Sequence, residues 1–133
     1  MEKADRNLLV IALSLIALAV VLGAMGAHAL ESVLSERALK SFDTAVKYQL
    51  MMSLGATLLI LLKHQFQLPI RAAAQLVLIG TVLFSGSIYA LTALPLESGL
   101  RAFFGPVTPI GGVFMIVGWM LATIRAARQT IKV

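Results

Sequence analysis

Apolar residues form four long runs along the chain, and polar residues gather between these runs. The runs cover about residues 8–30, 45–62, 72–94 and 109–124. The hydrocarbon core of a bilayer takes roughly 20 apolar residues at helical rise, so runs of this kind are suited to spanning it. They lack the alternation of apolar and polar residues that a membrane β-barrel needs. The pattern predicts an all-α membrane protein with four transmembrane helices in a compact bundle, as one domain over residues 1–133.

The polar segment between the first two runs predicts a short additional helix. Its sequence, "SERALKSFDTAVKY", repeats apolar residues every three or four positions. Glu36–Lys40 and Asp43–Lys47 are i,i+4 pairs of favourable order, and Ser35 is a suitable N-cap. We expect an amphipathic helix at the membrane interface that leads into the second span.

The start of the fourth helix is predicted from a local motif. Thr108-Pro109 combines a good N-cap residue with proline at the first helical position. The preceding "LPLESGLRAFFGPVTP" is rich in proline and glycine and is expected to be a loop.

The first apolar run has an alternative interpretation as a secretory signal peptide. "MEKADR" resembles a charged leader, and "AHA" resembles a cleavage site between small residues. The apolar run is about 18 residues, which exceeds the 7–15 typical of such leaders. We therefore interpret this run as a transmembrane helix.

Composition and charge support a membrane location. Of the 133 residues, 59% are hydrophobic and 13% are charged, which is too apolar for an ordinary soluble domain. The formal charge of +5 comes from basic residues that stand singly between the runs, so no basic face predicts nucleic-acid binding. The chain has no cysteine, which excludes a disulfide, a thiolate metal site and a thiol nucleophile.

The basic residues also predict the orientation of the helices. With four spans, one side of the membrane receives seven of them and the other side receives four. The seven are Lys3, Arg6, Lys63, Arg71, Arg125, Arg128 and Lys132, and the four are Arg37, Lys40, Lys47 and Arg101. Because the more basic side usually faces the cytoplasm, we expect both termini to be cytoplasmic in a bacterial inner membrane.

Small residues recur at helical spacing within the runs. Gly23 lies one turn from Ala19 and Ala27, and Gly111 and Gly118 share a helical face. Such stripes let helix backbones approach closely in lipid, although they could also clear space for a ligand. The candidate packing glycines are Gly23, Gly26, Gly80, Gly86, Gly111, Gly112 and Gly118.

Polar residues fall at similar predicted depths in the half of the bundle away from the termini. We expect them to form one compact cluster, made of His28, Tyr48, Gln49, Ser85, Ser87, Tyr89 and Thr108. His28 could instead bind a metal or haem, or carry a proton. The only other histidine, His64, falls in a loop on the opposite membrane face, so the two cannot share an ion. A structural role for His28 at the interface is the simpler interpretation.

No catalytic residue, cofactor-binding residue or metal ligand is predicted. Ser85 and Ser87 have no neighbouring base in sequence, and "GPVTPIGG" lacks the lysine step of a phosphate-binding loop. We therefore expect a protein that is not an enzyme and has no cofactor.

Four motifs in order, "LGAMGAHAL", "VKYQ", "LFSGSIYAL" and "VTPIGGVFMIVGW", resemble the YgdD-like family of small inner-membrane proteins, domain of unknown function 423. The resemblance extends over roughly residues 8–124. It implies a four-helix protein of bacterial inner membranes with relatives in eukaryotes, and no activity, cofactor or catalytic residue. Where the family pattern Tyr-Gln-x-x-His is expected, this chain has Met52 at the histidine position, which weakens any two-histidine site with His28. Met52 could bind copper or haem iron, but packing is the usual role of such a residue.

Two functions in different classes remain open. The first is a non-enzymatic structural or accessory membrane module of unknown molecular function, which packs with copies of itself or within a larger membrane complex. The alternative is an oligomeric transporter or channel for a small solute, although no buried acid pair or charge ladder marks a pathway. Besides these candidates, the only predicted partner is the lipid bilayer.

Overall fold

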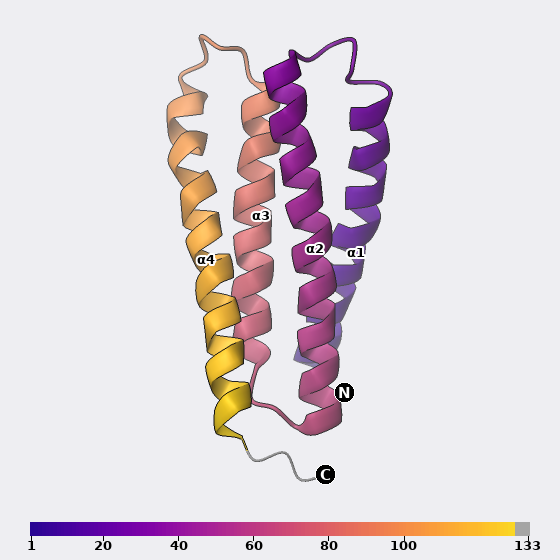
Figure 1. Ribbon diagram of the computed structural model, residues 1–133, viewed down its shortest axis with the longest axis vertical. Helices are drawn as coiled ribbons and strands as arrows, with labels where there is room; N and C mark the ends of the chain where they lie inside the picture. Colours follow the sequence, from indigo (N-terminus) through magenta and orange to yellow (C-terminus); the bar gives the residue numbers. More distant parts are fainter. Residues whose placement is uncertain (130–133) are drawn as a thin grey trace.

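The computed structural model describes residues 1–129 and has four long helices in an up-and-down bundle (Figure 1). The helices are α1 (Lys3–Ala27), α2 (Glu36–Phe66), α3 (Arg71–Ala93) and α4 (Leu100–Arg128). The predicted fold class and number of helices are therefore confirmed. Lys132, which entered the count of basic residues, lies outside the described residues.

All four helices are long and apolar enough to cross a membrane. Large apolar side chains remain exposed on each of them, including Val20 on α1, Leu58 on α2, Val82 on α3 and Ile116 on α4. In water such surfaces would be costly, but lipid is as apolar as the side chains themselves. The bundle therefore presents its outer faces to the bilayer as a multi-pass membrane protein.

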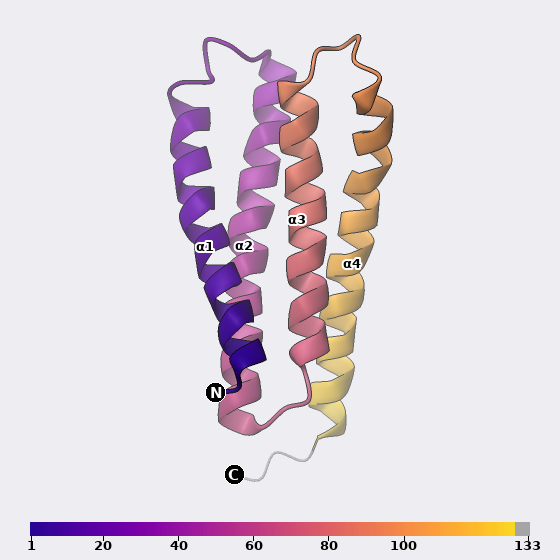
Figure 2. The same ribbon diagram turned by 180° about the vertical axis from the view of Figure 1, so that it is seen from behind.

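The helices lie side by side in the order of the sequence. α1 packs on α2, α2 on α3, and α3 on α4, while α1 and α4 lie at opposite edges in both views (Figures 1 and 2). The start of α1 and the end of α4 lie at one end of the bundle, together with the α2–α3 loop, and we call this the termini end (Figures 1 and 2). The opposite end, with the loops at 28–35 and 94–99, is called the far end.

The core between the helices is built largely from small side chains. Fully buried alanines from all four helices meet in one hydrophobic cluster, which also contains Ile60 and Val77 (the alanines are Ala12, Ala56, Ala73, Ala74 and Ala122). Short side chains bring the helix backbones close together, which matters in lipid because packing replaces the hydrophobic driving force.

The prediction of a separate interfacial helix before the second span is wrong. Residues 36–44 are the first turns of α2, which runs without a break from Glu36 to Phe66. Ser35 caps this longer helix by accepting a hydrogen bond from the Ala38 amide at 3.2 Å. The amphipathic pattern was real, but nothing between residues 36 and 45 is a glycine or proline that would end the helix.

The predicted start of the fourth helix is also wrong. α4 begins at Leu100, and both Pro106 and Pro109 lie inside it. Each proline removes one backbone donor from the helix, which costs least near an end where water or a neighbouring helix can satisfy the freed carbonyl. The loop between α3 and α4 is consequently only residues 94–99.

Three of the candidate packing glycines lie where α3 and α4 meet backbone to backbone. A Cβ atom added to Gly80 would stand 2.7 Å from the Gly111 carbonyl oxygen, and one added to Gly118 would stand 2.8 Å from Val77 Cγ2 and 3.0 Å from the Val77 backbone nitrogen. A Cβ atom on Gly111 would collide with the backbone of Phe84. These distances are shorter than real Cβ contacts, so only glycine fits at these three positions without a shift of the backbone.

The other glycines differ in their surroundings. A Cβ atom on Gly26 would meet the Phe42 ring at 3.0 Å, and one on Gly23 would make an ordinary 3.4 Å contact with Val46. Gly86 and Gly112 have no atom within 4 Å of an added Cβ, so within this bundle they make no close helix contact. The prediction omitted Gly55, where an added Cβ would overlap the ring of Trp119.

Candidate functional site

Gln49 is the centre of a polar network that crosses the middle of the bundle. Its side chain is buried, with the residue 2% exposed, although it lies on a membrane-spanning helix. Its Nε2 donates to the Leu15 carbonyl of α1 at 2.8 Å, and its Oε1 accepts from the Tyr89 hydroxyl of α3 at 2.7 Å. One amide side chain therefore connects three helices, and both of its polar atoms are engaged.

Hydroxyl groups extend this network to the remaining helix pairs. Ser85 donates to the Ala45 carbonyl at 2.7 Å, which joins α3 to α2. Ser87 and Thr108 hydrogen-bond to each other at 2.6 Å, which joins α3 to α4. Each neighbouring pair of helices thus shares at least one buried or part-buried polar contact. We call Gln49, Ser85, Ser87, Tyr89 and Thr108 the polar cluster.

His28, the most prominent of the predicted cluster residues, is not part of it. Its backbone amide caps the end of α1, and its side chain is exposed and makes no hydrogen bond within residues 1–129. The prediction placed the cluster at the end of α1, whereas Gln49 meets α1 at Leu15. His28 is thirteen residues further along the helix, about 20 Å away at helical rise.

Tyr48 and Met52 lie beside the polar cluster without joining it by hydrogen bonds. Tyr48 is 39% exposed, and its ring packs on Phe84 with ring centroids 4.8 Å apart. Met52, at the position of the expected family histidine, accepts a hydrogen bond from the Trp119 indole at a donor-to-sulfur distance of 3.3 Å. Its sulfur is thus used in the contact between α2 and α4.

A second polar group, at the termini end, was missed by the sequence analysis. The Asp5 carboxylate is buried and binds two cations, Lys63 at 2.7 Å and Arg71 at 2.6 Å. Glu2 pairs with the same two side chains, at 3.6 Å from the Lys63 nitrogen and in closer contact with Arg71. These four residues, the termini-end ionic network, tie the start of α1 to the end of α2 and the start of α3.

The ionic network changes the titration of its exposed member. The hydrogen bond from the Arg71 guanidinium, reinforced by the charges of Arg71 and Lys63, lowers the pKa of the Glu2 carboxyl below its usual value. The hydrogen bond is the largest of these effects, and each of them stabilises the ionised carboxylate relative to the protonated acid.

Further contacts close the termini end. Arg125 of α4 donates to the Pro69 carbonyl, and Gln129 donates to the Gln67 carbonyl at 3.4 Å. His64 is exposed, but it lies in the last turn of α2 and not in the predicted loop, and its carbonyl accepts from Gln67. A sequence signal for the network did exist. Asp5 is an acid in the first turn of α1, between Lys3 and Arg6, but its partners lie 58 and 66 residues away.

The contacts of these two polar groups join helices to one another. Residues 1–129 contain no group of three or more His, Asp or Glu side chains that could hold a metal ion. In the polar cluster, donors and acceptors face one another across helix pairs, so their main effect is to fix the register of the bundle.

Replacing Tyr89 with phenylalanine is expected to lower the free energy of unfolding by about 1 kcal/mol, because the buried Gln49 Oε1 loses its donor. Tyr48→Phe is the matched control, since that hydroxyl has no partner within the described residues, and it should change stability little. Thermal unfolding in detergent, followed by the fluorescence of the single tryptophan, measures both. Equal effects of the two variants would contradict the assigned network.

Comparison with known proteins identifies the family. Residues 22–112 match the family described as protein of unknown function (DUF423). A UPF0382 membrane protein of Schizosaccharomyces pombe is 44% identical over 103 residues, which cover 77% of this chain and 86% of the relative. The chain belongs to this family.

Bacterial relatives extend the comparison. The UPF0382 membrane protein YwdK of Bacillus subtilis is 34% identical over 113 residues, covering 84% of this chain and 88% of the relative. The UPF0382 inner membrane protein YgdD of Escherichia coli is 34% identical over 110 residues, which cover 82% of this chain and 80% of the relative. No solved structure matches this chain. The family match includes the whole polar cluster but only Lys63 and Arg71 of the ionic network.

Proposed function

We propose that this protein is a non-enzymatic inner-membrane module that acts by packing against other membrane proteins or further copies of itself. The observation that carries this proposal is the polar cluster, in which both polar atoms of Gln49 and the hydroxyls of Ser85 and Tyr89 bind other parts of the chain. Polar groups that hold a bundle together are not free to bind a solute or assist a reaction.

The exposed faces of the helices support the same proposal. α1 and α4 are the edges of the bundle (Figures 1 and 2). Each of them carries large exposed apolar side chains. The glycines that allow the closest approach, Gly80, Gly111 and Gly118, are already used between α3 and α4. An assembly would therefore use the outer apolar faces rather than these glycines.

The proposal is tested on the full chain, purified in a gentle detergent at native expression level. We expect a particle larger than the 14.2 kDa monomer, containing a second membrane protein or further copies of this one. Val20→Trp on the α1 edge or Ile116→Trp on the α4 edge should dissociate it without lowering the unfolding temperature. A monomer that carries a solute across reconstituted vesicles would contradict the proposal and favour a transporter.

The proposed orientation places both termini in the cytoplasm. Among the described residues, the termini end carries six lysines and arginines and the far end carries four (Lys3, Arg6, Lys63, Arg71, Arg125 and Arg128 against Arg37, Lys40, Lys47 and Arg101). Because basic residues are retained on the cytoplasmic side, a reporter active only in the periplasm should be silent after Val133 and active when inserted at Glu97. The opposite result would invert the topology.

A further inference from the structure

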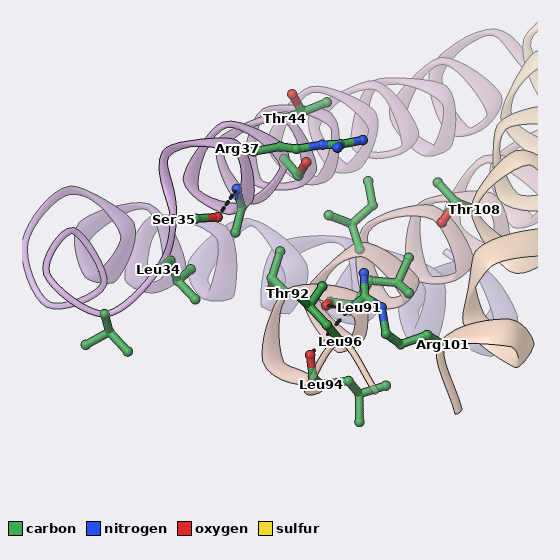
Figure 3. A pocket seen from close by; sticks show the side chains of 14 residues that line it. Leu34, Ser35, Arg37, Thr44, Leu91, Thr92, Leu94, Leu96, Arg101 and Thr108 are labelled. Carbon is green, nitrogen blue, oxygen red and sulfur yellow. Dashed lines mark hydrogen bonds between the residues drawn. The ribbon is translucent and has the colours of Figure 1, made fainter. Parts of the chain in front are cut away.

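A cavity of about 640 Å³ opens at the far end, between the first turns of α2, the end of α3 and the first turns of α4 (Figure 3). Two kinds of residue line it. One kind is cationic or carries a hydroxyl: Arg37, Ser41, Thr44, Thr92, Arg101 and Thr108. The other kind is apolar, as at Leu34, Leu91 and Leu96. The cavity shares Thr108 with the polar cluster, and its other lining residues belong neither to that cluster nor to the ionic network.

The charge of the cavity is positive. Two arginines line it, from α2 and α4, and no aspartate or glutamate of the described chain is among the lining residues. Arg101 donates from Nη1 to the carbonyls of Leu91 at 2.5 Å and Leu94 at 3.3 Å, which holds its guanidinium at the wall of the cavity (Figure 3). Within residues 1–129, the structure gives no ion pair to Arg37 or to the remaining nitrogens of Arg101.

Arginine and hydroxyl groups together suit a phosphate group. A guanidinium offers paired N–H donors that match two phosphate oxygens. The hydroxyls of Thr44, Thr92 and Thr108 already hydrogen-bond within the described chain, so among the wall residues named above the Ser41 hydroxyl is the one left to donate to a further oxygen. Carboxylates would repel such an anion, and none lines the cavity in the described chain. The apolar part of the wall is suited to contact the acyl chains of a ligand. A phospholipid has such chains, whereas free phosphate does not.

We propose that this far-end cavity binds a phosphate group through Arg37 and Arg101, and that the group is the headgroup phosphate of a phospholipid. The cavity lies where α3 ends and where α2 and α4 begin, which is the depth of lipid headgroups for helices that span the membrane. This goes beyond the packing role proposed above, because it assigns a ligand to the far end of the bundle.

The test is a binding titration by native mass spectrometry on the full chain in nonionic detergent. Three probes are compared: short-chain phosphatidylglycerol, the matching diacylglycerol without phosphate, and inorganic phosphate. We expect phosphatidylglycerol to bind and diacylglycerol not to bind. Arg37→Gln should weaken binding about tenfold, since one charge-assisted contact is lost.

Arg128→Gln is the matched control, because it removes the same charge from an exposed arginine at the termini end. It should leave the affinity unchanged. Arg101→Gln should also weaken binding, but it removes contacts to α3 as well, so Arg37→Gln is the decisive variant. The unfolding temperature of each variant shows that loss of binding is not loss of the fold.

Each outcome has a definite meaning. If inorganic phosphate binds as tightly as the lipid and depends on Arg37 in the same way, the phosphate site stands and its source is a soluble anion. Equal binding of phosphatidylglycerol and diacylglycerol would overturn the proposal, as would equal weakening by Arg37→Gln and Arg128→Gln.

Discussion

Replacing Gly111 with alanine is expected to lower the free energy of unfolding by about 3 kcal/mol, because α3 and α4 must move apart to admit one methyl group. The added Cβ atom would stand 2.8 Å from the Gly80 carbonyl oxygen and collide with the backbone of Phe84. A flexible side chain could turn aside, but these neighbours are backbone atoms of a packed helix. Thermal or denaturant unfolding in detergent, followed by Trp119 fluorescence, measures the loss.

The adjacent residue offers the control for this prediction. Gly112 is also on α4, but an added Cβ atom would have no neighbour within 4 Å. Because alanine is a better helix former than glycine by about 1 kcal/mol, Gly112→Ala should be neutral or slightly stabilising. If Gly111→Ala were as harmless as Gly112→Ala, the close approach of α3 and α4 would be incorrect.

The second large effect is expected at the termini end, where Asp5→Asn should cost about 2 kcal/mol. The substitution keeps the shape of the side chain but removes the buried charge between Lys63 and Arg71, leaving the exposed Glu2 as their only counter-charge in this network. The cost stays below that of a fully buried pair because the side chains of Lys63 and Arg71 are 19% and 31% exposed and can be partly solvated. The free energy of unfolding at neutral pH is the measured quantity.

Glu2→Gln provides a comparison that removes the same charge from the same network. The Glu2 side chain is 65% exposed, so water can replace most of what it contributes. We expect little change in stability. A loss from Glu2→Gln that matched the loss from Asp5→Asn would show that net charge at this end, rather than the buried carboxylate, determines stability.

The four spans could be predicted because hydropathy is read from residues that are adjacent in the sequence. The positions of the helix ends at the far end could not be predicted in this way. The start of α2 carries charges such as Glu36 and Lys40, so its polarity suggested a separate interfacial helix, and the two prolines of α4 suggested a loop. At a membrane interface, however, polar residues can continue a helix into water. A transmembrane span and the helix that contains it therefore have different lengths.

The polar side chains show a similar division. That Gln49 would seek a partner across the bundle follows from the cost of burying an amide in lipid. Which partner it finds depends on helix register, and the Leu15 carbonyl carries no signal in the sequence. The ionic network shows the same limit, because Asp5 meets residues that no local pattern links to it.

The distribution of glycines around the helices explains the mixed outcome for the packing predictions. Gly111 and Gly118 are seven residues apart, which returns to the same helical face, and both face α3. Gly112 is one residue from Gly111 and therefore points about 100° away from it. The sequence shows where small residues occur. Whether a neighbouring backbone approaches one of them depends on which face of the helix it occupies in the bundle.

Packing in chain order has a consequence for how the protein forms during synthesis. Each new helix meets a surface that is already in the bilayer: α2 meets α1 through Gln49, and α4 meets α3 through Gly111. Arg71 is the first residue of α3, so its ion pair with Asp5 can form when the third span begins to insert into the bilayer. Since chains emerge from the ribosome with the N-terminal part first, helix hairpins can be completed one after another. The bundle can thus be assembled by addition at one edge, without opening an earlier contact to insert a later helix.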